Sequence, residues 1–262
     1  GVRMLGKLMK YEWQATWKLL LPANLLIIVM TFFGCMAVRL NLGDIDNDGI
    51  MFGAVMILVT YVGSMFVVMI GTAIFLIYRF YTSTYGDQGY LLHTLPVDKH
   101  HIIIAKVLVS SGWVLFCSFL MYVSVVAIFM AEDGLIPEVI GSVGTVVETA
   151  GGAGSFLTGV MSVLAFVVSI VARVLKVTAC VSLGQLSPNH KLLMSFAYYF
   201  GIYFLQQTLG SFYYAFLGLI NRRLDQYYYG KTWEVTLIAS LLYTVVFYAV
   251  TWYTMDKRLN LD

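Results

Sequence analysis

Short segments of this 262-residue chain carry residue types that can bind phosphate or metal ions. Gly230, Lys231 and Thr232 match the end of a phosphate-binding loop, in which consecutive backbone N–H groups surround a phosphate. Such a loop needs another glycine five residues before Gly230, where this sequence has Asp225, and no strand is predicted before it. We therefore expect no nucleotide site in this chain.

Acidic side chains alternate in a second segment. Asp44, Asp46 and Asp48, followed by Gly49, reproduce the first half of a calcium-binding loop. The twelfth position, which normally supplies a bidentate glutamate, is Val55. Weak calcium binding and a solvated acidic turn both remain open.

Histidines form the third candidate group. His93, His100 and His101 lie close in sequence, but adjacent histidines point to different faces of a helix. No carboxylate or cysteine completes a ligand set, and no nucleophile motif accompanies them. We interpret them as polar-loop residues and expect neither a metal site nor an enzyme.

The amino-acid composition indicates a membrane protein. Hydrophobic residues make up 60% of the chain and charged residues 11%, against roughly 25% charged in soluble domains. Cys35, Cys117 and Cys180 fall within apolar stretches, and we interpret them as packing residues. The net charge of +2 does not suggest nucleic acid as a partner. The sequence predicts an all-α integral membrane protein.

Six apolar stretches are long enough to cross a membrane as helices. The predicted spans are residues 19–40, 50–78, 102–130, 155–176, 192–220 and 235–255. Residues 4–18 form a mixed basic and aromatic stretch, which predicts an amphipathic helix lying in the interface, and residues 256–262 form a tail. Pro22 then falls near the start of the first spanning helix, where its missing N–H costs least.

The lysines and arginines predict the orientation. With six spans both termini lie on one side, and 12 of the 16 basic residues fall on that side. By the positive-inside rule both termini are cytoplasmic. The remaining basic residues are Arg39, Arg222, Arg223 and Lys231.

The centres of the predicted spans lack charged residues, and Arg173 and Lys176 are expected near a span end. This argues against an ion-coupled carrier. Polar residues inside the spans could line a translocation path or bond between helices. They are Asn24, Ser110, Ser111, Gln206 and Gln207.

The most distinctive segment joins the second and third spans. Leu91, Leu92 and Leu95 form an apolar edge beside polar residues, and Pro96 ends the segment. This pattern predicts a short amphipathic helix on the cytoplasmic surface, and a simple connector resting on lipid is the alternative.

Several stretches together resemble a known family. They are MLGKLMKYEW at the start, GDQGYLLHTLPV before the third span, SLGQLSPNHK followed by YYFGIYFLQQ, and KRLNLD at the end. The chain is similar over nearly its whole length to permease subunits of bacterial ABC-2 type (type V) exporters, in particular those of Firmicutes. The long segment 132–154 departs from the family, whose extracellular hairpin lies between the fifth and sixth spans.

The resemblance implies a location in the plasma membrane of a bacterium, and a mechanism. Two six-span subunits would pair as a homodimer or a heterodimer on two ATP-binding subunits, which hold the ATP and magnesium, so this chain has no cofactor of its own. The loop between spans two and three would be the coupling helix, with a second contact at residues 184–191. The coupling positions would be Tyr85, Asp87, Gln88, Tyr90, Leu91, Leu92, Pro96, Gly184 and Gln185.

The expected function is export of an amphipathic or peptide-like substrate. Aromatic side chains are abundant, with 17 phenylalanines and 18 tyrosines, but they also populate ordinary interfacial belts. The alternative is a non-transporting membrane component: an immunity or sensor subunit of a peptide-response complex, or a scaffold.

Overall fold

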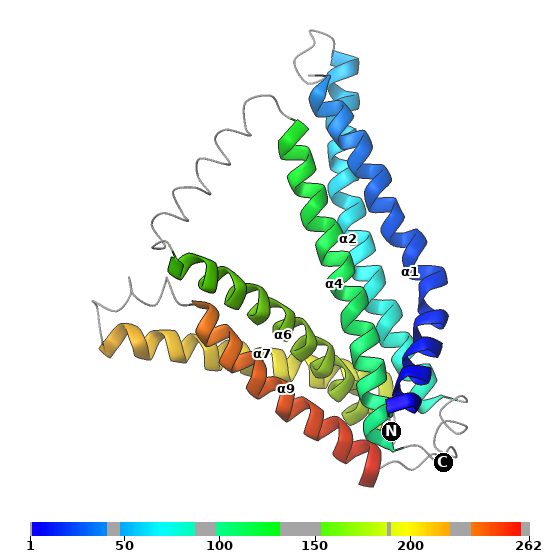
Figure 1. The fold of residues 1–262 in the computed structure, drawn as a ribbon, viewed down its shortest axis with the longest axis vertical. Helices are drawn as coiled ribbons and strands as arrows, with labels where there is room; N and C mark the ends of the chain where they lie inside the picture. The colour runs from blue at the N-terminus through cyan, green and yellow to red at the C-terminus, as the bar shows by residue number, and fades with distance from the viewer. Residues whose placement is uncertain are drawn as a thin grey trace. The chain divides into compact units, whose positions relative to one another are not determined.

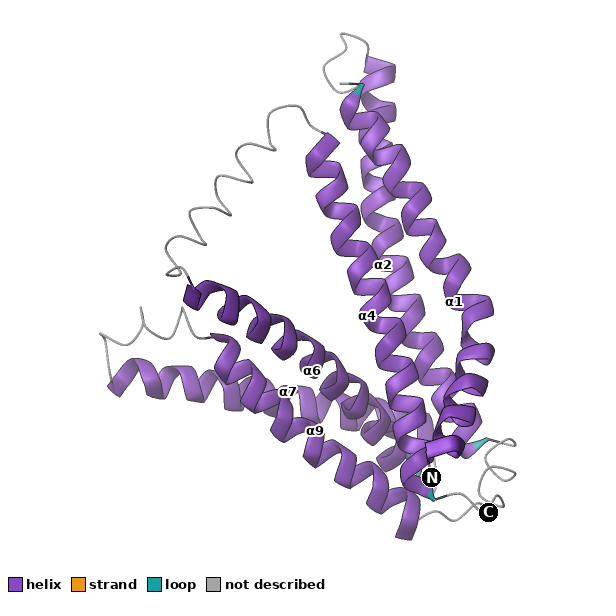
Figure 2. Ribbon diagram, in the orientation of Figure 1, coloured by secondary structure: helices purple, strands orange, loops and turns teal. Residues whose placement is uncertain are grey.

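The chain folds into long helices in a computed structural model that describes residues 2–40, 48–86, 98–131, 153–187, 190–220 and 232–257. No strand occurs in these ranges, as Figure 2 shows by colour. The helices, labelled in Figure 1, are α1 (Val2–Arg39), α2 (Asp48–Tyr85), α4 (Lys99–Ala131), α6 (Ala153–Gly184), α7 (Lys191–Ile220) and α9 (Thr232–Lys257).

Five of these helices are long and apolar enough to cross a membrane: α1, α2, α4, α6 and α9. The chain is therefore a multi-pass helical membrane protein. The sixth predicted span corresponds to α7, whose 30 residues reach about 45 Å at 1.5 Å each. It is not among the five, and its sequence contains several tyrosines and the pair Gln206 and Gln207.

Helices are what an apolar environment demands, because every backbone N–H and C=O must be bonded within the segment. Hydroxyl side chains also form their hydrogen bonds within the helix that carries them. Thr60 and Ser118, for example, each donate to the carbonyl oxygen four residues earlier, at 2.7 and 2.8 Å. Large apolar side chains such as Phe204 (74% exposed) and Val67 (69% exposed) face outward, as lipid-facing residues do.

The first helix differs from the sequence-based prediction. We expected an interfacial helix over residues 4–18 and a separate span from residue 19, but α1 runs unbroken from Val2 to Arg39. Pro22 accordingly lies inside a helix and not at the start of one. The apolar run after Lys18 continues the helical pattern without a turn residue, so a single helix forms.

Two other helices extend beyond the predicted ends of their spans. The second span was expected to end at Tyr78, and α2 continues to Tyr85. The fourth was expected to end at Lys176, and α6 continues to Gly184. Small and β-branched residues after Lys176 sustain the helix, so Lys176 lies inside α6, about 12 Å before its end.

The chain divides into two compact units. Unit 1 comprises Gly1–Met9, Ile77–Ser111 and Ala153–Asp262, and unit 2 comprises Lys10–Leu76 and Gly112–Gly152. Helices α1, α2 and α4 contribute residues to both units, whereas α6, α7 and α9 belong to unit 1.

Unit 2 is a packing of α1, α2 and α4, which lie side by side in Figure 1. Its apolar core joins Ile27, Val68 and Cys117, one from each helix. Above this core the Ser124 hydroxyl bonds to Thr31 at 2.5 Å and to the Tyr61 hydroxyl at 2.8 Å. One serine therefore connects all three helices.

A buried tryptophan also ties α4 to α1 in unit 2. The Trp113 indole N–H donates to the Thr16 hydroxyl at 2.8 Å, and its ring stacks on Trp13 with centroids 4.6 Å apart. Trp113 is 2% exposed, so this hydrogen bond satisfies a donor that water cannot reach.

Unit 1 has its core on α6. Buried residues from α4, α6 and α9 form one cluster: Ile103, Val107, Leu175, Ala179, Phe247 and Met255. Helix α6 packs against both α9 and α7. Helix α6 is therefore the element that α7 and α9 share.

Candidate functional site

The segment that carries the family resemblance starts where α2 ends. Tyr85, the last residue of α2, donates its hydroxyl hydrogen to Ser182 of α6 at 2.7 Å. Ser182 is 1% exposed and in turn donates to the Thr178 carbonyl oxygen at 2.8 Å. The beginning of the segment is therefore fixed to the last turns of α6.

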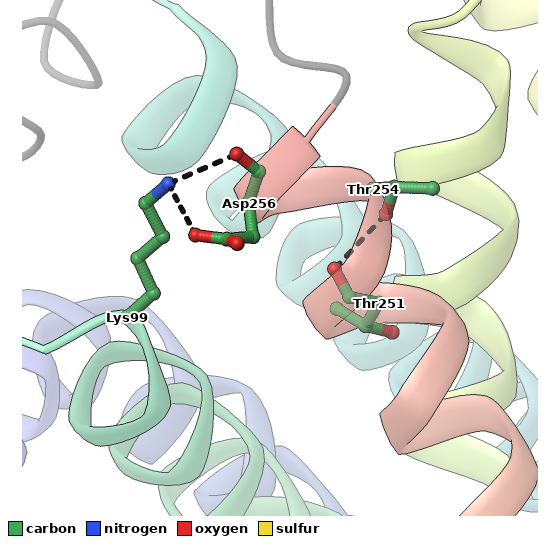
Figure 3. A network of polar contacts seen from close by, with 4 residues as sticks. All are labelled: Lys99, Thr251, Thr254 and Asp256. Carbon is green, nitrogen blue, oxygen red and sulfur yellow. Dashed lines mark hydrogen bonds and ion pairs between the residues drawn. The ribbon is translucent and has the colours of Figure 1, made fainter.

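The same segment ends where α4 begins. The Lys99 ammonium lies 3.0 Å from the Asp256 carboxylate and 3.4 Å from its carbonyl oxygen, at the end of α9 (Figure 3). Next to it, the His100 Nδ1 and the Tyr248 hydroxyl are 2.6 Å apart, and the imidazole stacks on Trp252. The end of the segment is therefore fixed to the last turns of α9.

A buried cation joins the two helices that flank the segment. The Lys106 ammonium of α4 donates to the Ser83 hydroxyl of α2 at 2.5 Å, and Ser83 donates to the Arg79 carbonyl oxygen at 2.6 Å. Lys106 is only 6% exposed. Because a buried charge must keep its hydrogen bonds, α2 and α4 are held at one separation here.

The predicted second contact is the turn between α6 and α7. A Cβ at Gly184 would lie 2.7 Å from the Lys191 carbonyl oxygen and would clash with Ser195, so only glycine fits. Gln185 follows in a tight turn, with its backbone N–H bonded to the Ser182 carbonyl oxygen at 3.3 Å. His190 adopts a left-handed conformation (φ 56°) just before α7.

Three of the nine predicted coupling residues lie within the described part of the chain. Tyr85, Gly184 and Gln185 lie in unit 1 at the ends of α2 and α6. Six predicted coupling residues lie outside the described residues: Asp87, Gln88, Tyr90, Leu91, Leu92 and Pro96.

The predicted path residues fall in both units. Asn24 belongs to unit 2, where its amide N–H donates to the Leu20 carbonyl oxygen at 2.8 Å. Ser110 and Ser111 lie on α4 in unit 1, and the buried Ser111 hydroxyl has no hydrogen bond to the described residues. Gln206 and Gln207, in contrast, both line a cavity of about 660 Å³ between α6, α7 and α9.

Lys176 is the residue of this cavity that sequence reasoning missed. It was expected at a span end, but it is 9% exposed and lines the cavity together with Arg173. Its ammonium donates to Gln206 Oε1 at 3.1 Å and lies 5.0 Å from the ring centroid of Tyr199. The signal available in the sequence was the unbroken helical stretch beyond Lys176.

The described residues do not bring the candidate metal ligands together. Among the described residues no three His, Cys, Asp or Glu side chains cluster as ligands would. His100 bonds to Tyr248, and His101 Nδ1 lies 3.6 Å from an Asp98 carboxylate oxygen. Asp44, Asp46 and His93 lie outside the described ranges.

Searches against protein-family models, curated proteins and solved structures find no match to this chain. The site must therefore be argued from its own contacts. Those contacts join the end of α2 to α6 through Ser182, and the start of α4 to α9 through Asp256 and Tyr248.

Proposed function

We propose that this chain is the membrane permease subunit of an ATP-driven exporter, with ATP hydrolysed on separate partner subunits. The observation that carries the proposal is that the two residues flanking segment 86–98 contact two different spanning helices. Tyr85 bonds to Ser182 of α6, and Lys99 bonds to Asp256 of α9. A partner that binds the segment and moves it would move both helices.

Stiffness at the base of the segment supports this role. The Lys106–Ser83 bond joins the two flanking helices, so they respond as one element. Switching proteins transmit movement through packed elements that shift as rigid bodies between two positions, and α2 and α4 would be such an element here. The predicted coupling helix would then carry force from the ATP-binding subunit to α6 and α9.

The finer parts of the proposal follow from the family resemblance. Helix α7 crosses the bilayer as a sixth span, both termini are cytoplasmic, and the chain pairs with a second permease subunit. The substrate is an amphipathic or peptide-like molecule that leaves the bacterial cell. The cavity between α6, α7 and α9 supplies polar groups within the spans.

The test is purification of the intact chain from its native membrane in mild detergent. We expect an ATP-binding protein to co-purify, and its ATP hydrolysis in vesicles to change when this chain is present. Leu91→Glu with Leu92→Glu should abolish that association, because two charges replace the apolar edge of the predicted helix.

Leu40→Glu is the matched control. Leu40 is an exposed leucine that directly follows Arg39, the last residue of α1, and it does not belong to segment 86–98. It should leave association unchanged. A chain that retains ATP-binding protein with both Leu91 and Leu92 changed would contradict the assignment of the segment. Purification without any ATP-binding protein would favour the alternative, a non-transporting immunity, sensor or scaffold subunit.

A further inference from the structure

The cavity of unit 1 has an unusual charge balance for a membrane-spanning region. Its walls come from α6, α7 and α9, and its volume of about 660 Å³ suits one ligand of several hundred daltons. Arg173 and Lys176, one helical turn apart on α6, both line it. No aspartate or glutamate occurs among the described lining residues.

Within the described part of the chain, Lys176 has polar neighbours but no charged partner of opposite sign. Its ammonium donates to Gln206 Oε1 at 3.1 Å and lies 5.0 and 5.6 Å from the ring centroids of Tyr199 and Tyr203. These contacts are uncharged and leave a net positive charge at a side chain that is 9% exposed. An intramembrane cation of this kind marks a functional site, because burying an uncompensated charge is costly.

Part of the wall is apolar. Leu209 of α7 and Ile238 and Leu242 of α9 line the cavity and are 55–62% exposed, so the cavity is open along its apolar side. In a bilayer that side meets hydrocarbon chains. The cavity thus combines two cations with an opening that a hydrocarbon tail can enter.

We propose that this cavity binds one anionic amphiphile from the membrane. Its anionic group, a phosphate or a carboxylate, would lie between Arg173 and Lys176, with Gln207 as an additional hydrogen-bonding group. Its hydrocarbon chain would follow Ile238 and Leu242 of α9. The site does not depend on the proposed function, since it follows from the cavity alone.

The competing explanation is purely structural. Lys176 could serve only to hold α7 against α6 through Gln206 and the tyrosines. That role would require neither Arg173 nor a cavity, and it would make no distinction between anionic and zwitterionic lipids. The two explanations therefore predict different lipid selectivity.

The experiment uses the full chain purified in micelles that contain equal amounts of phosphatidylglycerol and phosphatidylcholine, with retained lipid measured by mass spectrometry. We expect the unchanged chain to enrich phosphatidylglycerol. Lys176→Met and Arg173→Gln should each lower that enrichment about tenfold, because each removes one charge-assisted contact. Lys176→Arg should retain it.

Lys18→Met is the matched control, since it removes an exposed cation of α1 that does not line the cavity. It should leave the enrichment unchanged. Arg173 is exposed, so Arg173→Gln keeps the test valid if Lys176→Met fails to fold.

Unchanged enrichment in Arg173→Gln and Lys176→Met, or no enrichment in the unchanged chain, would overturn the proposal. So would a lower melting temperature of Lys176→Met with its lipid ratio intact. Inorganic phosphate should remove no more bound lipid than sulfate does at equal ionic strength, because the hydrocarbon chain of the lipid contributes to binding. Full displacement by phosphate would reveal a free-anion site and would also overturn it.

Discussion

At the scale of single residues, hydroxyl groups connect helices that are otherwise apolar. Ser124 in unit 2 and Ser182 in unit 1 each bond to a tyrosine from another helix. A net contribution of about 1 kcal/mol is typical of such a bond, and an unpaired buried donor costs about 1–3 kcal/mol. These few polar contacts therefore decide which helix faces meet.

Removing the Tyr85–Ser182 bond should weaken the attachment of segment 86–98. Tyr85→Phe and Ser182→Ala each remove the same hydrogen bond, so their effects on stability should not add. We expect a coupling energy of about 1 kcal/mol in a double-mutant cycle measured by thermal unfolding in detergent. Full additivity would show that the bond does not form.

Thr16→Val should destabilise the chain through Trp113. Valine has nearly the shape of threonine, but it leaves the buried indole N–H without its acceptor, which costs about 1–3 kcal/mol. Thr60→Val is the control: Thr60 is exposed and bonds only to its own helix, so a change of no more than about 0.5 kcal/mol is expected. Equal melting temperatures for the two variants would contradict the Trp113–Thr16 contact.

At the scale of elements, α1 is a single helix that contains a proline. In the interior of a helix proline removes a backbone hydrogen bond, whereas at the first turn it costs little. Pro22→Ala should therefore stabilise the chain, by about 1 kcal/mol or more, as measured by thermal unfolding. A loss of stability would instead favour a helix that starts near residue 19.

Distances along α1 give a direct measurement. Spin labels on cysteines at Tyr11 and Val29, both exposed positions, lie 18 residues apart. A continuous helix separates the two Cα atoms by about 27 Å, whereas a right-angled break near residue 20 gives about 19 Å. The native cysteines would first be replaced by alanine.

The sequence predicted helical elements well and their ends less well. Hydrophobic composition and length identified every described helix, because those properties are summed over many residues. The ends were missed where a charge or proline was read as a boundary, as at Lys18 and Lys176. Both residues lie inside helices, since a neighbouring element or the membrane surface can accommodate an isolated cation.

The candidate site was predictable only in part. Gln206 and Gln207 stood out as polar residues in an apolar stretch, and the structure brings both to the cavity. The partners of Tyr85 and Lys99 were not foreseen, because Ser182 and Asp256 lie far from them in sequence. Such pairings depend on how α6 and α9 pack.

At the scale of the whole molecule, the number of spans decides the orientation of the ends. If α7 crosses the bilayer with the other five helices, Lys10 and Lys257 lie on the same side; with five spans they lie on opposite sides. We expect cysteines placed at Lys10 and Lys257 to resist a membrane-impermeant thiol reagent in intact cells and to react in inverted vesicles.

A cysteine at Leu40 is the control and should show the reverse pattern, since α1 separates it from Lys10. The native cysteines are again replaced. Labelling of Lys10 and Lys257 from opposite sides would contradict the six-span topology.

The contact between Lys176 and α7 also bears on how the chain is made. During synthesis α6 enters the membrane before α9 exists, and a lysine within a span opposes insertion, by about 3 kcal/mol at the span centre and less towards its end. Gln206, Tyr199 and Tyr203, which surround the ammonium, all belong to α7, the next helix made. If α7 crosses the bilayer as proposed, the pair α6 and α7 brings the polar partners of this cation into the membrane before α9 is made.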